Sequence, residues 1–372
     1  MPSSKHVLIT GITGMDGSIL ADYLLSLGYT VYGLVRRSAS SNKGRIAHLN
    51  QHPKVHLLDG DITDQESIHR AIERSQPEMI FNLAAQSFVP YSWDAPLNTF
   101  SITGMGALHI LEAIRNIDRS IKFYQASSSE MFGKVLETPQ KETTPFHPRS
   151  PYGVAKVAAH YATINYHESF GIHASSGILF NHEHERRGEH FVTRKISKGV
   201  AKYFSDRERK QPLTPITLGN LEAKRDWGYA EDYVKAMYKI INHPTPETFV
   251  VATGVTRTVK EWCEATVQSY ALMTNRSSGH IDWKGSGEDE KGYFEGDLIF
   301  SVSKEFYRPA EVDLLLGDPT KAWEKLNWKP ETPFEEMVGR MFKYDYAKMN
   351  LIHMATKASS DSHSPYQTSF CH

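Results

Sequence analysis

The 372-residue chain has only two cysteines, Cys263 and Cys371, which lie far apart in the sequence. Two distant cysteines exclude the disulfide framework of a small secreted domain and suit a reducing compartment, so the sequence predicts a cytoplasmic protein. The chain also lacks an apolar run of about 18 residues, the length that a membrane span needs. No apolar signal segment follows Met1. We therefore expect a protein that is not inserted in a membrane.

A large net charge is missing as well. Lysine and arginine number 42 and aspartate and glutamate 43, which leaves a formal net charge of -1 at pH 7. Such a chain has no overall attraction to the phosphates of nucleic acids or to anionic membranes, so neither is expected as a partner. Hydrophobic residues make up 40% of the sequence. Length and composition together predict a large globular protein with two lobes.

What the sequence does contain begins with a glycine motif. Residues 6–10 are a short apolar run, three spaced glycines follow, and apolar residues then recur at helical spacing as far as Gly28. In the order strand, loop and helix, such glycines bind a dinucleotide, because they allow a tight turn and let the backbone approach a pyrophosphate at the helix N-terminus. The alternative is a glycine-rich turn that binds no ligand. The motif predicts cofactor contacts for Gly11, Thr13, Gly14, Asp16 and Gly17.

Strands and helices alternate further along the chain. Apolar runs predict strands at 30–35, 55–62, 78–85, 121–126 and 174–180, and residues 249–252 are expected to rejoin the same sheet. A helix is predicted over residues 98–115, and its buried face is expected to consist of Ile102, Met105, Leu108, Leu111 and Ile114. This alternation predicts an α/β fold with a doubly wound parallel sheet of the Rossmann type. Ligands bind such a sheet at the carboxyl ends of its strands.

The end of the second predicted strand indicates which cofactor binds. Arg36, Arg37 and Ser38 stand where an NAD-binding protein carries an acid for the ribose 2′-hydroxyl. Two cations and a hydroxyl suit the 2′-phosphate of NADP, so NADP is favoured over NAD. The alternative is that both arginines are only solvated.

The next two strand ends supply further candidate cofactor contacts. Asp61 and Ile62 end the third predicted strand, where an acid can reach the adenine. Leu83 and Ala85 end the fourth predicted strand and Ser87 follows it, in a segment of small residues whose backbone can pass close to the cofactor.

The fifth predicted strand leads into the candidate catalytic residues. Ser128 and Glu130 lie at its end, and Tyr152 and Lys156 are four residues apart in a segment that Pro151 predicts to be the start of a helix. Residues at this spacing share a helix face, so the Lys156 ammonium can lower the pKa of the Tyr152 phenol and make it a usable base. By itself the spacing favours a solvated helix face, and only the residues upstream shift the interpretation toward catalysis.

Beyond residue 180 the pattern is less regular, and a smaller, discontinuous α/β substrate-binding domain is predicted. We expect the cofactor-binding domain at 1–180 and 226–255, the substrate-binding domain at 181–225 and 256–349, and a disordered tail at 350–372. The segment 284–296 is predicted to be a loop. Cations near aromatic residues suit an anionic substrate with a ring, such as a sugar nucleotide, although each cation alone could be solvated. These cations are Arg186, Arg187, Arg194, Lys195, Arg225 and Arg308.

Together with these residues, several longer motifs resemble the extended short-chain dehydrogenase/reductases and, within them, the GDP-mannose 4,6-dehydratase family. The resemblance covers residues 5–345 and is strongest in the blocks 11–17, 145–156, 177–183, 186–189, 191–196, 225–228, 307–312 and 316–320. It implies a hydro-lyase that converts GDP-D-mannose to GDP-4-dehydro-6-deoxy-D-mannose and water, on the way to GDP-deoxyhexoses such as those of fucose or rhamnose. In relatives the loop that matches 36–45 reaches a neighbouring subunit's cofactor, which implies a homotetramer or a dimer.

The resemblance also implies a role for each matching residue. Tyr152, helped by Lys156, would take the proton of the sugar 4-hydroxyl while bound NADP oxidises C4. Ser128 would hydrogen-bond the 4-oxygen, and Glu130 would remove the C5 proton and protonate the departing 6-hydroxyl before hydride returns to C6. No metal is implied. Substrate contacts are implied for Ser87, Glu130, Asn181, Lys195, Arg225 and Arg308, and cofactor contacts for Tyr152, Lys156, His182 and Arg187.

The sequence departs from the family pattern at a few positions. Ser128 stands in place of the usual threonine, and Asn98 stands in place of a tyrosine that contacts the cofactor. His184-Glu185 replaces Ser-Pro, which predicts a more mobile loop at this point, and Tyr229 replaces a histidine. None of these changes removes a catalytic group.

Two other functions stay open from the sequence. One is an NADPH-dependent reductase of the 4-keto-6-deoxy product, alone or as a second activity. Glu130 argues against a reductase alone, because hydride delivery to C4 needs only the tyrosine and the hydroxyl. The other is a non-catalytic NADP-binding protein on the same fold, which the complete set of Ser128, Glu130, Tyr152 and Lys156 argues against.

Overall fold

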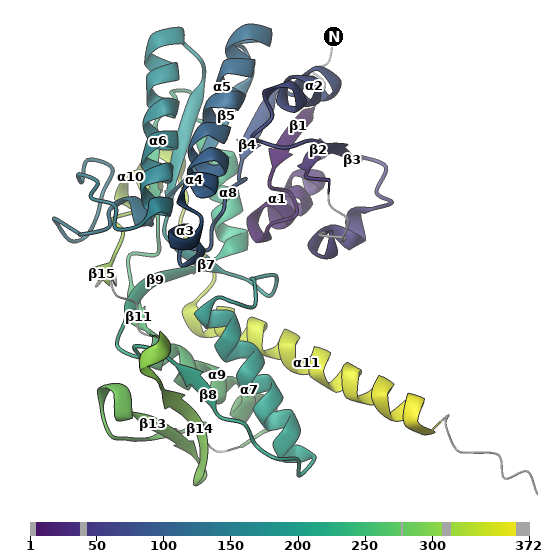
Figure 1. Cartoon of the computed structure of the whole chain (residues 1–372), viewed down its shortest axis with the longest axis vertical. Helices are drawn as coiled ribbons and strands as arrows, with labels where there is room; N and C mark the ends of the chain where they lie inside the picture. Colours follow the sequence, from purple (N-terminus) through teal and green to yellow (C-terminus); the bar gives the residue numbers. More distant parts are fainter. Residues whose placement is uncertain (1–4, 38–42, 277, 307–313, 362–372) are drawn as a thin grey trace, which may run out of the picture. The chain divides into compact units, whose positions relative to one another are not determined.

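The computed structural model describes residues 5–37, 43–276, 278–306 and 314–361 (Figure 1). The chain forms two compact units that interleave in the sequence. Unit 1 consists of Met1–Arg186, Ala223–Arg257 and Arg308–Phe334, and unit 2 of Arg187–Glu222, Thr258–Tyr307 and Glu335–His372.

Unit 1 is built on a parallel sheet that has seven strands in the described part of the chain. Their order is β10-β6-β5-β4-β1-β2-β3, so β1 lies between β4 and β2 at the switch point where such sheets bind ligands. This order confirms the predicted doubly wound Rossmann-type fold, and β10 joins the sheet as expected, where it pairs with β6. The strands are β1 (His6–Thr10), β2 (Thr30–Val35), β3 (Val55–Asp59), β4 (Met79–Asn82), β5 (Lys122–Ser128), β6 (Ala174–Leu179) and β10 (Thr248–Val251).

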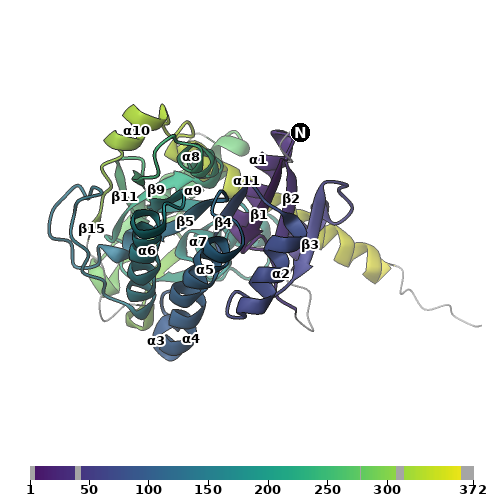
Figure 2. The same cartoon turned by 90° about the horizontal axis from the view of Figure 1, so that it is seen from above.

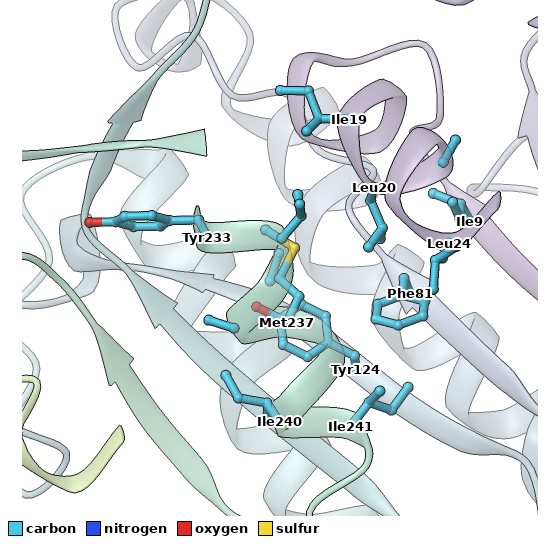
Figure 3. Packing of buried hydrophobic residues seen from close by; sticks show 14 of the residues in the cluster. Ile9, Ile19, Leu20, Leu24, Phe81, Tyr124, Tyr233, Met237, Ile240 and Ile241 are labelled. Carbon is cyan, nitrogen blue, oxygen red and sulfur yellow. The ribbon is translucent and has the colours of Figure 1, made fainter. Parts of the chain in front are cut away.

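Helices cover both faces of this sheet. Figure 2 shows α1 and α8 on one face and α2, α5 and α6 on the other. Successive strand residues face opposite sides, so Phe81 and Tyr124 pack with α1 and α8 (Figure 3), whereas Ile80 and Phe123 join the core on the α5 side. The larger helices of unit 1 are α1 (Met15–Ser26), α2 (Gln65–Ser75), α5 (Gly106–Ile117), α6 (Pro151–Phe170), α8 (Ala230–Ile241) and α10 (Thr320–Leu326).

Helix α6 begins where the sequence predicts. The Ser150 hydroxyl accepts a hydrogen bond from the backbone N–H of Gly153 at 3.0 Å, and Pro151 occupies the first helical position, where its missing N–H has no partner to lose. Gly171 ends the helix with φ of 70°, a conformation that glycine adopts without strain. These signals place Tyr152 and Lys156 in the first two turns.

Shorter elements complete unit 1. Strand β9 pairs in parallel with β7 and β15, and β11 belongs to the same small sheet. The shorter elements are η1 (Gly44–Leu49), α3 (Tyr91–Asp94), α4 (Pro96–Phe100), η2 (Ser101–Met105), η3 (Ser129–Met131), β7 (Asn181–Glu183), β9 (Lys224–Tyr229), β11 (Thr256–Thr258) and β15 (Leu314–Leu315).

Unit 2 contains a sheet in the order β12-β13-β14-β8 together with three longer helices in its described residues. Helix α9 begins with a capping box in which the Thr258 hydroxyl and the Glu261 carboxylate bond each other's backbone N–H. None of the helices in the described ranges has the length and apolarity to cross a bilayer. The elements are α7 (Val192–Glu208), β8 (Ile216–Leu218), α9 (Val259–Met273), β12 (Asp282–Lys284), η4 (Gly287–Asp289), β13 (Lys291–Phe294), β14 (Asp297–Val302), η5 (Lys304–Phe306) and α11 (Phe334–Asp361).

The predicted loop at 284–296 is wrong from residue 291 onward. Strands β13 and β14 form an antiparallel hairpin there, and Phe294 lies opposite Asp297. The two residues between them, Glu295 and Gly296, have φ of 50° and 89°. Positive φ at both central positions gives the turn whose twist matches that of two paired strands, so this charged, glycine-rich segment is a tight hairpin.

Two helix predictions also need correction. The continuous helix over 98–115 is interrupted by a π-helical turn, η2 (Ser101–Met105). The extra residue in such a turn rotates the preceding residues relative to α5, so Met105 is 38% exposed although Leu111 and Ile114 are buried. The predicted disordered tail begins at 350, whereas α11 continues to Asp361, in a stretch with good helix formers such as Ala355 and Lys357. Residues 362–372 lie outside the described ranges.

Candidate active site

The glycine loop between β1 and α1 is closely packed against the end of β4. Gly11 has φ of 75°, and a β-carbon there would lie 2.8 Å from the Leu83 carbonyl carbon and from the Ala84 nitrogen. A β-carbon on Gly17 would lie 2.2 Å from the Gly11 oxygen. Gly14 precedes helix α1 as its N-cap and offers no side-chain hydrogen bond, so the first turn of the helix can donate N–H groups to a phosphate. The cradle therefore fits a dinucleotide pyrophosphate.

The predicted cofactor residues at the strand ends lie along this edge of the sheet. Asp61 follows β3, and its carboxylate accepts bonds from the Thr63 N–H and hydroxyl at 2.9 and 2.8 Å. Ile62 is buried. The segment after β4 that carries Leu83, Ala85 and Ser87 has no regular secondary structure, and Ser87 is exposed. The structure thus places these residues beside the glycine loop or on the same edge of the sheet.

Arg36 and Arg37 directly follow β2, and both side chains are exposed. Ser38 lies outside the described residues. Two exposed arginines thus lie at the strand end where folds of this class bind the adenosine ribose of a dinucleotide.

His182 joins the glycine loop to the small β7–β9 sheet. Its Nε2 lies 3.0 Å from a carboxylate oxygen of Asp16, and its Nδ1 lies 2.7 Å from the Phe180 carbonyl oxygen. The ring stacks on Tyr233 at a centroid distance of 4.5 Å. Two predicted cofactor residues, His182 and Asp16, are therefore in direct contact.

Sequence reasoning missed the role of Arg45 within its own chain. Its Nε donates to the Arg186 carbonyl oxygen at 2.7 Å and its Nη1 to the Thr13 carbonyl oxygen at 3.4 Å. Arg186 in turn forms an ion pair with Asp22 of α1 at 2.8 Å. Arg45 lies far from the glycine motif in the sequence and carries no local signal that would have pointed to this contact.

The four candidate catalytic residues come from β5, η3 and α6. Ser128 ends β5, and its hydroxyl accepts a bond from the Glu130 N–H at 3.3 Å. Tyr152 and Lys156 are buried on α6, and the Lys156 ammonium lies 5.7 Å from the centre of the Tyr152 ring. A β-carbon on Gly153 would lie 2.8 Å from the Glu130 carbonyl oxygen. The glycine beside Tyr152 therefore lets η3 pack against the first turn of α6.

A chain of hydrogen bonds between buried polar side chains leads from Lys156 across the sheet. Lys156 Nζ donates to the Ala126 carbonyl oxygen at 2.7 Å, and Gln125 Nε2 donates to the same oxygen at 3.1 Å. Asn82 donates to Gln125 Oε1 at 2.8 Å, and the Thr10 hydroxyl donates to Asn82 Oδ1 at 2.7 Å. Because a carbonyl oxygen only accepts, every amide in this hydrogen-bond chain has a fixed orientation. The hydrogen-bond chain links the lysine to the strand that leads into the glycine loop.

Burial sets the protonation behaviour of Lys156. Loss of solvent lowers its pKa to about 8, and the Asp16 carboxylate acts in the opposite direction. The ammonium therefore remains the main form at neutral pH, but it is more acidic than the ammonium of an exposed lysine.

The predicted substrate residues fall in both units. In unit 1, Asn181 lies on β7, opposite Trp227 of β9, and Arg225 is a buried residue of β9 whose Nη1 donates to the Lys224 carbonyl oxygen at 2.8 Å. In unit 2, burial lowers the pKa of Lys195, whose ammonium lies 3.7 Å from the centre of the Phe306 ring.

The remaining predicted binding residues are Arg187 and Arg308. The Arg187 guanidinium, also in unit 2, lies 3.6 Å from the centre of the Phe191 ring. Arg308 lies outside the described residues. Within the described ranges, no cluster of histidine, cysteine, aspartate or glutamate could hold a metal ion.

Three residues that depart from the family pattern pack together. His184 is buried and stacks on Tyr229 at a centroid distance of 5.1 Å. The Tyr229 hydroxyl donates to Glu185 at 3.0 Å, and the same carboxylate lies 3.1 Å from His184 Nδ1. These contacts oppose the mobility that the sequence predicts for this loop. Asn98, another departure, is an exposed residue of α4.

Known proteins of one family resemble this chain along most of its length. The family model described as GDP-mannose 4,6 dehydratase matches residues 8–341. The chain belongs to this family. It is 47% identical over 352 residues to the GDP-mannose 4,6 dehydratase of Homo sapiens, which covers 92% of this chain and 91% of the relative. It is 44% identical over 353 residues to the Vibrio cholerae enzyme of that name, covering 92% and 94%.

Solved structures of lower identity share the fold of this family member. The UDP-glucose 4-epimerase of Thermotoga maritima has a TM-score of 0.73 and 23% identity, covering 93% of this chain and 99% of that one. The dTDP-glucose 4,6-dehydratase of Bacillus anthracis, in complex with NAD, has a TM-score of 0.72 and 18% identity, covering 92% and 96%.

Proposed function

We infer that this chain is a GDP-mannose 4,6-dehydratase, a hydro-lyase that converts GDP-D-mannose to GDP-4-dehydro-6-deoxy-D-mannose and water. Family membership across most of the chain supports this function. The observation that carries it is the position of Glu130, which lies two residues after Ser128 and packs against the first turn of the helix that bears Tyr152 and Lys156. A 4-epimerase or a 4-keto reductase has no step that requires this carboxylate.

The proposed mechanism assigns one task to each of these side chains. Tyr152 takes the proton of the 4-hydroxyl, and the adjacent Lys156 ammonium favours the phenolate. The Ser128 hydroxyl donates to the 4-oxygen. Glu130 then removes the C5 proton, which the 4-keto group has made acidic, and returns a proton to the departing 6-hydroxyl. A nicotinamide cofactor on the glycine loop supplies the hydride chemistry, with oxidation at C4 and reduction at C6.

NADP is the cofactor that we propose, with Arg36 and Arg37 on the 2′-phosphate. Their position at the end of β2 and their exposure support this choice. The glycine loop, Asp61, Ile62, Leu83, Ala85 and Ser87 would hold the rest of the cofactor, with His182 and Arg187 nearby. Asn181, Lys195, Arg225 and Arg308, together with Ser87, are the proposed contacts to the GDP-sugar. We retain the cytoplasm as the proposed location.

The purified protein, stripped of nucleotide, is expected to convert GDP-mannose to a product lighter by one water when NADP+ is supplied. With NAD+ the rate should fall about tenfold, because only NADP+ offers a ribose 2′-phosphate to the arginines. Mass spectrometry of the products, with the rate followed over time, measures both. Arg36→Glu should remove the preference for NADP+, whereas Arg74→Glu, a charge reversal on the exposed end of α2, should not.

Three other results of this experiment would change the proposed function. No loss of water with either cofactor would overturn the dehydratase assignment, and equal rates with NAD+ would overturn the choice of NADP. A further gain of two hydrogens on addition of NADPH would establish the second, reductase activity.

A homotetramer, or a dimer, is the proposed assembly. Apolar side chains of α3, α4 and α6 support it, because Trp93, Leu97 and Tyr161 are 61%, 86% and 55% exposed. These three helices contact one another (Figure 2), so their exposed side chains can form one apolar surface. A second copy of the chain is the partner that covers such a surface in a homo-oligomer.

Leu97→Glu is expected to shift the protein to a smaller species in sedimentation velocity, because it introduces a charge into this apolar surface. Leu272→Glu is the matched control, since Leu272 is a comparably exposed leucine on α9. A wild-type protein that sediments as a monomer would contradict the proposal.

A further inference from the structure

Ser127 and His160 form a buried pair between the strand and the helix that carry the candidate catalytic residues. The Ser127 hydroxyl lies 2.9 Å from His160 Nδ1, and the two residues are only 2% and 3% exposed. Ser127 stands between Ala126, whose carbonyl oxygen binds Lys156, and Ser128. Neither side chain is accessible to substrate, so the pair can affect catalysis only through the positions of β5 and α6, which it joins.

The position of His160 gives the pair a defined geometric effect. Tyr152, Lys156 and His160 are spaced four residues apart and share one face of α6. On β5, side chains alternate, so Ser127 points to the same side as Phe123, toward the core that α6 covers. The bond between Ser127 and His160 therefore gives α6 a second attachment to β5, one helical turn beyond the bond between Lys156 and Ala126.

A third contact extends the pair to η3. The Phe146 ring meets the His160 ring edge to face at 5.3 Å, and Phe146 also contacts Phe132 at 5.3 Å. Phe132 directly follows η3, the element that carries Glu130. The imidazole is thus held between the tip of β5 and the aromatic side chain that packs on η3.

His160 is suited to holding these elements rather than to proton transfer. Burial lowers the pKa of His160 to about 4, so the ring is neutral over the working range of most enzymes. A neutral imidazole can keep one hydrogen bond to a hydroxyl without bringing a charge into the core.

We propose that Ser127 and His160 are positioning residues for the dehydratase reaction, and that their hydrogen bond sets the distance between the Ser128 hydroxyl and the Tyr152 phenol. The inference rests on the proposed function. A displacement of about 1 Å between reacting groups can cost about 100-fold in rate. Substrate and cofactor contacts lie elsewhere, so loss of the pair lowers kcat and leaves KM unchanged.

Ser127→Ala and His160→Phe are each expected to lower kcat about tenfold without a change in KM. The double variant should be no slower than the slower single variant, because both changes remove the same bond. His160→Asn places an acceptor oxygen close to the former Nδ1 and should recover most of the rate. Steady-state kinetics with GDP-mannose measures all four proteins against wild type.

Thr163→Val supplies the matched control. Thr163 is buried on the same helix, and its hydroxyl donates to the Ala159 carbonyl oxygen at 2.9 Å without reaching β5. This variant should lose similar stability and keep its kcat. Unchanged kcat in Ser127→Ala, an equal loss in Thr163→Val, or losses that multiply in the double variant would overturn the proposal. Activity of the wild type tests the proposed function separately.

Discussion

Glu130→Gln is expected to lower the rate of water loss from GDP-mannose by about 10³-fold, the effect of removing a general acid and base. Glutamine keeps the size of the side chain and can neither take the C5 proton nor protonate the 6-hydroxyl. Proton removal from the 4-hydroxyl depends on Tyr152 and Lys156, which are unchanged. Oxidation at C4 should therefore still occur, and the reduced cofactor should accumulate to one equivalent per site, as measured by its absorbance.

The accumulation of reduced cofactor separates this expectation from a general loss of structure. A misfolded variant would neither oxidise nor dehydrate the sugar. Glu168→Gln, an exposed position near the end of α6, supplies a control that should keep the full rate. Water loss at the wild-type rate in Glu130→Gln would remove Glu130 from the mechanism and weaken the dehydratase assignment itself.

Lys156→Met is expected to reduce the dehydratase rate by about 10³-fold while making the folded protein more stable at pH 7. Burial lowers the pKa of Lys156 from its ordinary 10.5 to about 8, so the folded state holds the charged form at a cost. At about 1.4 kcal/mol per pKa unit, less the lost bond to Ala126, the variant should gain about 2 kcal/mol. Urea unfolding of both proteins measures this difference.

The pH dependence gives a second test of the same variant. Between pH 8 and 10.5 the unfolded chain binds a proton on Lys156 that the folded protein has already released, so the stability of the wild type rises with pH relative to the variant. The advantage of Lys156→Met should therefore be largest at pH 7 and small at pH 10. If the variant is less stable than wild type at pH 7, the expectation is wrong. The hydrogen bond of Lys156 to Ala126 would then stabilise the folded protein by more than burial of the charge destabilises it.

The sequence predicted the elements whose signals are local. The glycine loop between β1 and α1, and the Ser150-Pro151 start of α6, depend on a few adjacent residues, and both are found where predicted. The parallel, doubly wound type of the main sheet followed from the alternation of strands and helices. The candidate catalytic residues were proposed for the same reason, since each lies at the end of a predicted strand or the start of a predicted helix.

Features that depend on distant residues could not be predicted. The hydrogen-bond chain joins Thr10, Asn82 and Gln125, which lie on three strands and become neighbours only through the register of the sheet. Met105 is exposed because of a π-helical turn, for which apolar spacing carries no signal. In the β13–β14 hairpin, a glutamate adopts positive φ where asparagine, aspartate or glycine is usual, so the turn was mistaken for a loop.

The order of strands in unit 1 has a consequence for how the chain folds during synthesis. Strand β6 ends at Leu179, but its partner β10 begins only at Thr248, after the first stretch of unit 2 has been made. Until then β6 presents an unpaired edge with free backbone hydrogen-bonding groups, the kind of edge that recruits other chains. A nascent chain must therefore keep that edge protected on the ribosome until β10 emerges, and chains truncated before residue 248 would be left with it permanently.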